Sequence, residues 1–153
     1  IQVSSNFERA LYFAYGKDGA AVAGLMEELK AGGFTLSQGV KAALAGAFDS
    51  GRCSEAETSA TITATLKNAA ELLCPHTAVG VKVAEEQRVQ GVPMITLATA
   101  HPAKFPDAVE AASGIRPGLP PHMADLFERP ERVTRLSNDL SALEAHVREH
   151  RRK

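Results

Sequence analysis

The stretch that decides the fold is residues 54–80, SEAETSATITATLKNAAELLCPHTAVG, which predicts two consecutive helices. Ser54 and Glu57 have the spacing of a capping box, in which each residue satisfies a free backbone N–H of the other at a helix start. Apolar residues then recur with a helical period, at Ile62, Leu66, Ala69, Ala70 and Leu73. We therefore predict one helix over residues 55–73 and a second over 75–90 that begins with proline, a favoured first residue.

Start and stop signals on the N-terminal side of this stretch predict three shorter helices. The first spans residues 6–15 and ends at a glycine, the second runs from Asp18 to the Gly32-Gly33 pair, and the third follows Ser37 and reaches Leu44. Residues 48–53 are expected to form a short edge strand. This half of the chain is therefore predicted to be mainly helical.

The C-terminal side contains the best strand candidate. Residues 93–98, PMITLA, form a continuous apolar run, which is typical of a strand buried on both faces. A helix over 105–112, a loop over 113–121, a strand over 132–136 and a last helix around Leu140–Val147 are expected to follow. The predicted fold class is helix-rich α/β, with a short, mostly parallel sheet flanked by helices, in one compact unit of residues 1–153.

Composition excludes several classes of protein. The 153 residues are 44% apolar and 23% charged, with a net charge of −1, so no basic footprint for nucleic acid is present. Two cysteines are too few for a disulfide framework or a zinc site, and no metal site is expected. No apolar run is long enough to cross a membrane and no signal peptide is recognisable, so we expect a cytoplasmic protein without a membrane partner. Because the chain begins with Ile1, we expect either a processed terminus or a piece of a longer chain.

The first candidate site is residues 74–80, CPHTAVG, at the start of the predicted second helix. Free backbone N–H groups and the helix dipole favour an anion or a polar ring atom there, and His76 and Thr77 lie in the first turn. The alternative is that these residues only begin the helix, with Pro75 in its first position and threonine bonding its own backbone.

The second candidate is residues 97–105, LATAHPAKF, where the predicted buried strand ends. Ligands collect at the carboxyl ends of strands in open α/β sheets, so Thr99 and His101 are expected to face a site and Lys104 to reach a phosphate or carboxylate. The alternative is a tight turn in which Pro102 breaks the strand and His101 satisfies a backbone carbonyl.

The third candidate is residues 4–9, SSNFER, at the start of the first helix. Hydroxyl and amide groups such as those of Ser5 and Asn6 are ordinary helix caps, but they also bind phosphate when a residue such as Arg9 is nearby. No complete active site is recognisable in the chain.

These segments together resemble threonine synthase. The resemblance is carried by VSSNFER (3–9), PHTAVGV (75–81) and the stretch from VPM to AHPAKFP (92–106), and it extends over essentially the whole chain. It implies the C-terminal portion of a pyridoxal-phosphate enzyme of fold type II, which converts O-phospho-L-homoserine and water into L-threonine and phosphate. The family's Schiff-base lysine and its Gly-Asn-Phe-Gly loop lie upstream and are absent here, so we expect the chain alone to be inactive and not to bind the cofactor.

The resemblance also assigns residues. Thr77 matches the hydroxyl partner of the pyridine nitrogen, and the adjacent His76 is expected to shape the cofactor pocket. The expected substrate residues are Ser5, Asn6, Arg9, His101 and Lys104, while Lys104 is not the cofactor lysine. Where the family usually has Asp, this chain has Cys74, a poor helix cap with an expected cost of about 0.5–2 kcal/mol.

A second hypothesis is a stand-alone α/β module, derived from such an enzyme fold, that binds a small molecule or another protein. The two hypotheses differ in their surfaces. A portion of an enzyme should expose apolar faces that the missing N-terminal part covers, and should therefore tend to self-associate. A stand-alone module should be polar all round.

Overall fold

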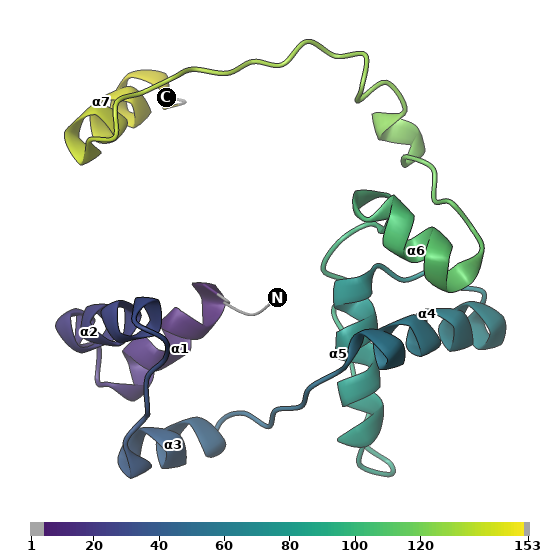
Figure 1. The fold of residues 1–153 in the computed structure, drawn as a ribbon, viewed down its shortest axis with the longest axis horizontal. Coiled ribbons are helices and arrows are strands. Elements are labelled where there is room, and N and C mark those ends of the chain that lie inside the picture. Colours follow the sequence, from purple (N-terminus) through teal and green to yellow (C-terminus); the bar gives the residue numbers. More distant parts are fainter. Residues whose placement is uncertain (1–4, 152–153) are drawn as a thin grey trace. The chain divides into compact units, whose positions relative to one another are not determined.

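The computed structural model describes residues 5–151. Their regular secondary structure consists of helices joined by irregular segments (Figure 1). Whereas the sequence predicts one compact unit, the contacts group residues 1–117 and 118–153 into two. The helices of the first unit are α1 (Ser5–Ala14), α2 (Gly19–Lys30), α3 (Gln38–Ala45), α4 (Glu55–Ala69), α5 (Pro75–Glu86), the 3-10 turn η1 (Pro102–Lys104) and α6 (Pro106–Ser113). The second unit contains the 3-10 turn η2 (Pro121–Met123) and α7 (Leu140–His150).

Helices α1, α2 and α3 pack together, and the predicted caps start two of them. The Asp18 carboxylate accepts hydrogen bonds from the first turn of α2, and the Ser37 hydroxyl accepts one from the Val40 N–H at 3.4 Å in α3. Their contact surface is a small apolar core consisting of Leu11, Val22, Leu25 and Val40. The predictions for these three helices are confirmed.

Helices α4, α5 and α6 form the second packed group, with α4 against both others. Ile62 on α4 is 1% exposed and packs with Leu73 and Ala78. The predicted capping box at Ser54 is present. Helix α4 nevertheless ends at Ala69, earlier than predicted, because Ala70 takes a left-handed conformation with φ of 55°. Leu73, predicted as helical, contributes to the core from the connection instead.

The predicted sheet is not confirmed, since residues 5–151 contain no strand. The segments 48–53, 93–98 and 132–136 are all without regular structure. A strand needs a neighbour to pair its backbone N–H and C=O groups, and apolar sequence alone does not supply one. The apolar run therefore stays on the surface, with Ile95 80% and Leu97 75% exposed.

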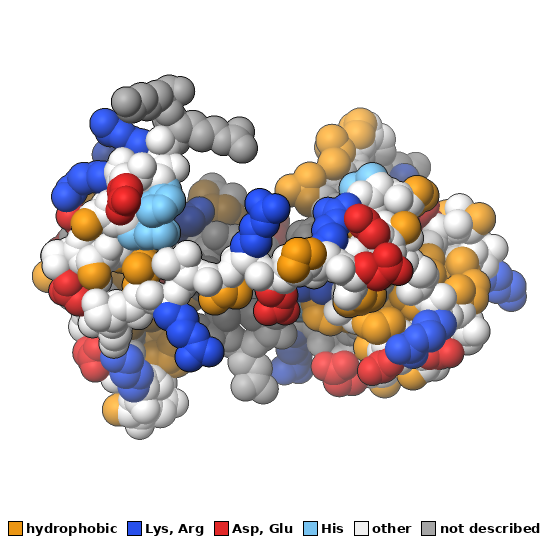
Figure 2. All heavy atoms as spheres, turned by 90° about the horizontal axis from the view of Figure 1, so that it is seen from above, with side chains coloured by type: hydrophobic (Ala, Val, Ile, Leu, Met, Phe, Trp, Pro, Cys, Tyr) orange, Lys and Arg blue, Asp and Glu red, His pale blue; other side chains and the backbone are white. Residues whose placement is uncertain are grey.

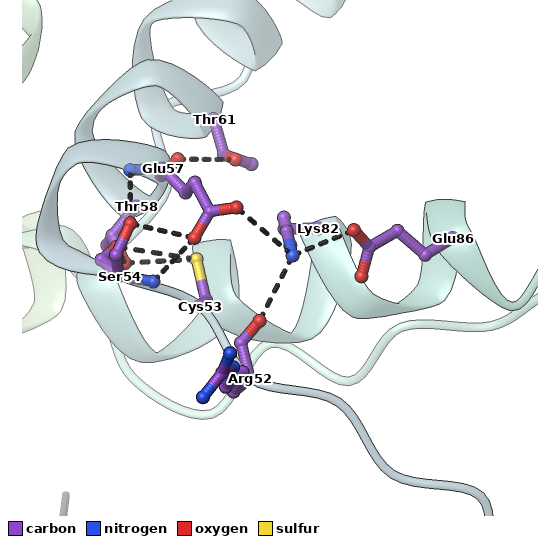
Figure 3. A network of polar contacts seen from close by, with 8 residues as sticks. All are labelled: Arg52, Cys53, Ser54, Glu57, Thr58, Thr61, Lys82 and Glu86. Carbon is purple, nitrogen blue, oxygen red and sulfur yellow. Dashed lines mark hydrogen bonds and ion pairs between the residues drawn. The ribbon is translucent and has the colours of Figure 1, made fainter.

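A polar network around Lys82 joins the segment before α4 to α4 and α5 (Figure 3). The Lys82 Nζ lies 2.8 Å from Glu86, 3.4 Å from Glu57 and 3.0 Å from the Arg52 carbonyl oxygen. Gly51 sits against Val83, where an added Cβ would come within 2.7 Å of a methyl carbon. We call Arg52, Glu57, Lys82 and Glu86 the Lys82 network; it fixes how the chain enters α4.

Hydrogen bonds and charges in this network shift two pKa values. The Ser54 backbone N–H, then the Ser54 hydroxyl and Lys82, lower the pKa of Glu57 to about 2. Glu86, followed by Glu57, raises the pKa of Lys82 above its ordinary value. Both side chains are therefore held in their charged forms at neutral pH.

The unit of residues 118–153 has little core of its own. Asp139 caps α7 by accepting from the Ala142 N–H at 3.0 Å. The apolar side chains of α7 stay exposed, and Leu140 is 70% exposed. Figure 2 shows that hydrophobic side chains also reach the surface among charged ones elsewhere in the chain. Within the described residues, no helix has the length and apolar character needed to span a membrane.

Candidate functional site

The site begins with the N-terminus of α5, which is capped by a sulfur atom. Cys74 has extended backbone angles, and its Sγ accepts a hydrogen bond from the Thr77 N–H at 3.4 Å. Pro75 occupies the first turn, as predicted. Cys74 therefore does cap the helix, although a thiol sulfur is a weaker acceptor than a carboxylate.

The Thr77 hydroxyl is the central group of the site. Thr77 is 5% exposed, and its Oγ1 accepts a hydrogen bond from the Thr99 N–H at 3.2 Å. The same oxygen lies 3.1 Å from Cys74 Sγ. The structure thus brings together two motifs, residues 74–80 and 97–105, that are far apart in the sequence.

A cavity of about 350 Å³ opens beside this hydroxyl. It is lined by residues 71–74, Thr77 and residues 98–102. His101 is one of the lining residues and also caps η1, because its Nδ1 accepts a hydrogen bond from the Ala103 N–H at 3.1 Å. The segment is thus a tight turn at Pro102, and His101 at the start of that turn also lines the cavity; its Nδ1 accepts from a backbone N–H rather than donating to a carbonyl.

Hydrogen bonds also affect the pKa of the Cys74 thiol. Burial raises its pKa, but contacts with the Thr77 hydroxyl and with the backbone N–H groups of Thr77, His76 and Ala100, which favour the thiolate form, outweigh burial. The pKa of Cys74 consequently lies below its ordinary value.

His76 and Lys104 pack beside the cavity rather than lining it. The His76 ring meets the Phe105 ring edge-on, with 4.7 Å between the ring centroids. The Lys104 Nζ lies 5.6 Å from the centroid of the same Phe105 ring. Phe105 therefore packs His76 of α5 against the turn η1, which contains Lys104.

The candidate residues of the first helix lie elsewhere. Asn6 lines a separate cavity of about 570 Å³ between α1 and α3, together with Phe7, Lys41 and Phe48. Arg9 is exposed on α1. The side chain of Ser5 and the whole of Ser4 lie outside the described residues. The structure therefore does not bring Asn6 or Arg9 to the cavity beside Thr77.

Two features of the site were not predicted from the sequence. One is the backbone N–H of Thr99 as the partner of Thr77, and the other is the Cys74 thiol as a second partner. Backbone groups carry no sequence signal, and the sequence marks Cys74 only as the first residue of the candidate segment 74–80 and as a poor helix cap. Within residues 5–151, no cluster of His, Cys, Asp and Glu side chains is arranged to hold a metal ion.

A concave pocket beside a buried hydroxyl at a helix N-terminus is a candidate site for a small molecule. A sequence model of the family described as "Threonine synthase, C-terminal" matches residues 77–147. The chain is 48% identical to the threonine synthase of Pseudomonas aeruginosa over 98% of its length, and 38% identical to that of Methylobacillus glycogenes over 98%. It also aligns with a crystal structure of PLP-bound threonine synthase from Brucella melitensis, with 51% identity, a TM-score of 0.71 and all of this chain covered.

The chain therefore belongs to the threonine synthase family, and it corresponds to the C-terminal portion of that enzyme. It spans about a third of the length of the relatives it matches: 33% of the Pseudomonas protein, 32% of the Methylobacillus protein and 33% of the Brucella chain.

Proposed function

We propose that residues 1–153 form the C-terminal portion of a pyridoxal-phosphate-dependent threonine synthase. The complete enzyme would convert O-phospho-L-homoserine and water into L-threonine and phosphate. The buried Thr77 hydroxyl beside its cavity carries this proposal, and the similarity to threonine synthases over the whole chain supports it.

The groups around Thr77 fit the ring nitrogen of pyridoxal phosphate. A hydroxyl stays protonated at neutral pH, so it donates a hydrogen bond to an unprotonated nitrogen and does not force the ring to become a pyridinium. The groups in contact with Oγ1 are an amide and a thiol, while the one carboxylate lining the cavity, that of Glu71, is exposed. When bound, the cofactor supplies an electron sink for negative charge that develops on the substrate carbons.

Each remaining candidate has a defined contribution in this proposal. The Thr99 N–H holds the Thr77 oxygen in place. His101 carries its proton on Nε2, because Nδ1 accepts from Ala103, so Nε2–H is a donor for an anionic group of the substrate. His76 shapes the pocket through Phe105.

The charged and amide candidates would recognise the substrate phosphate. Lys104 supplies a cation next to the turn that bears His101. Asn6 and Arg9, with Ser5, would contribute from α1 in the complete enzyme, where other parts of the protein complete the site.

We further propose that the chain alone is inactive, because the lysine that binds the cofactor covalently belongs to the N-terminal part. Lys82 is unsuited to that role, since its ammonium is held by two carboxylates and a carbonyl and its pKa is raised. The exposed apolar side chains of Ile95 and Leu97 are a surface that the N-terminal part would cover. Without that part, the same surface favours self-association.

The test compares residues 1–153 with the full-length protein. Each is incubated with pyridoxal phosphate, reduced with borohydride and digested for mass spectrometry, and phosphate release from O-phospho-L-homoserine is assayed in parallel. We expect the full-length protein to release phosphate and to be labelled at one lysine outside residues 1–153. Specific labelling of one lysine within residues 1–153, or the absence of phosphate release by the full-length protein, would contradict the proposal.

A further inference from the structure

The Thr77 hydroxyl differs from the hydroxyls of Thr58 and Thr61 in its hydrogen-bond partners. Thr58 on α4 donates its proton to the Ser54 carbonyl oxygen at 2.9 Å, and Thr61 donates to the Glu57 carbonyl oxygen at 2.8 Å. Within the described part of the chain, Thr77 Oγ1 instead contacts the Thr99 N–H, which can only donate, and the Cys74 sulfur. The direction of the Thr77 proton therefore depends on Cys74.

The contact between Cys74 Sγ and Thr77 Oγ1 can run either way. A hydroxyl oxygen has two acceptor positions and one proton. If the thiol S–H donates, it fills the second acceptor position of Oγ1, because the Thr99 N–H already fills the first. The Thr77 proton then has to point away from both groups. The remaining direction is into the cavity that Thr77 lines.

We propose that Cys74 is a positioning residue whose S–H donates to Thr77 Oγ1 and thereby turns the Thr77 hydroxyl proton into the cavity. This inference rests on the proposed function, since the cavity ligand that accepts the proton is an unprotonated pyridine nitrogen. A Thr77 proton that points into the cavity favours binding of a ring nitrogen without a proton, which can accept the hydrogen bond. It disfavours a protonated ring nitrogen, which cannot. The sulfur remains free to accept from the Thr77 N–H and so caps α5 at the same time.

Ionisation of the thiol would reverse the contact. A thiolate has no proton to give, so it accepts the Thr77 proton and withdraws it from the ligand. The pKa of Cys74 is lowered, which brings this reversal closer to neutral pH. Cofactor affinity should therefore fall as pH rises through the thiol pKa.

Other titratable or charged groups surround the same region. They are Glu71 and His101, which line the cavity, and His76 and Lys104, which pack beside it. A Cys74→Ser variant leaves all four in place and keeps an O–H donor that does not ionise in this range. Any pH dependence that arises from these four groups should persist in that variant.

The experiment is a titration of the full-length apo-protein with pyridoxal phosphate at about pH 7 and about pH 9, on either side of a thiol's ordinary range. Binding and the absorption maximum of the bound cofactor are recorded. We expect the affinity of the unmodified protein to fall about three- to tenfold, the contribution of one hydrogen bond, and the maximum to shift. Cys74→Ser should lose the part of both changes that the thiol causes and keep only the part that arises from the four neighbouring groups. The matched control Cys53→Ser, which alters the cysteine outside the cavity, should behave like the unmodified protein.

Two further outcomes separate this inference from the function on which it rests. If Cys74→Ser retains the full pH dependence, the inference is wrong, whereas the proposed function stands as long as Thr77→Val weakens cofactor binding. If Thr77→Val binds pyridoxal phosphate as tightly as the unmodified protein at about pH 7, the proposed function and the inference both fail.

Discussion

The described residues contain two cysteine–threonine pairs, each at the start of a helix, and only one of the two threonines donates its hydroxyl proton to a backbone carbonyl. At α4, Cys53 Sγ lies 3.3 Å from Thr58 Oγ1, and at α5, Cys74 Sγ lies 3.1 Å from Thr77 Oγ1. The Thr58 proton is donated to a backbone carbonyl oxygen, whereas Thr77 receives a backbone N–H. The same two residue types thus form a pair with the threonine proton bonded to the backbone at α4. At α5 they form a pair whose threonine is proposed to donate its proton to a ligand.

The surroundings of the two pairs explain this difference. The Cys53 pair adjoins a capping box and the Lys82 network, where carboxylates, a lysine and carbonyl groups satisfy one another (Figure 3). Both pairs adjoin a cavity, of about 390 Å³ at Cys53 and about 350 Å³ at Cys74, but the start of α5 has only a sulfur cap. A helix start in which every polar group has a partner contributes to folding, whereas one with an available donor can bind a ligand.

The largest effect is expected from a substitution in the core between α4 and α5, because it would disturb both cysteine–threonine pairs. Ile62 is 1% exposed in the core shared by α4 and α5, so Ile62→Ala should reduce the free energy of unfolding by about 2–5 kcal/mol. Urea unfolding followed by circular dichroism measures this change. Val147→Ala on α7 is the matched control, since that side chain is 56% exposed and should change stability by about 0.5 kcal/mol or less. Equal losses in the two variants would show that α4 and α5 do not share a stabilising core.

The second prediction separates the two threonines. Thr77→Val should weaken pyridoxal phosphate binding by the full-length protein about tenfold, because it removes the donor to the ring nitrogen. Thr58→Val should leave that affinity unchanged and instead reduce stability by about 0.5–1.5 kcal/mol, through loss of the bond to the Ser54 carbonyl. Isothermal titration and thermal unfolding measure the two quantities. Equal effects of both variants on binding would remove the distinction between the pairs.

The third prediction concerns the pH dependence of the Lys82 network. The pKa of Glu57 is about 2 in the folded chain, against an ordinary value of 4.5. A lowered pKa stabilises the folded state above the ordinary value, and this contribution is lost as pH falls from 4.5 towards 2. Glu57→Gln should therefore reduce the loss of Tm over this acidic interval. Glu55→Gln, in the same first turn, should show the same decrease of Tm with falling pH as the unmodified protein. A smaller decrease of Tm in both variants would contradict the role assigned to Glu57.

The smallest expected effect is on helix capping. Cys74→Ala removes the sulfur that accepts from the Thr77 N–H, so it should reduce the free energy of unfolding by about 0.5–1 kcal/mol. Cys53→Ala should cost less, since Ser54 caps α4 with a complete capping box. Differential scanning calorimetry of the two variants provides the comparison. A larger loss for Cys53→Ala would mean that the sulfur cap of α5 contributes little.

The helices could be predicted because their signals are local. Asp18, Ser37 and Ser54 each cap the helix predicted from them, since a cap depends on residues within one turn. Helix ends were less accurate: Ala70 adopts a left-handed conformation although nothing in its residue type requires it. Local sequence therefore determined where helices start more reliably than where they stop.

The sheet and part of the site could not be predicted, because both depend on contacts between distant segments. Residues 93–98 have the composition of a strand, but pairing requires a partner strand, and the described residues contain none. Thr77 was identified by resemblance, whereas its bond to the Thr99 N–H depends on how the chain returns to α5 after residue 91. Asn6 and Arg9 were predicted for the same substrate, yet the structure does not bring them to the Thr77 cavity.

The availability of the Thr77 proton is tested most directly by a crystal structure of the full-length protein with pyridoxal phosphate bound. The expected result is a ring nitrogen within about 3.2 Å of Thr77 Oγ1, with the Thr99 N–H still donating to that oxygen. A ring nitrogen that faces a carboxylate instead, with the Thr77 hydroxyl bonded to a backbone carbonyl as in Thr58, would contradict it.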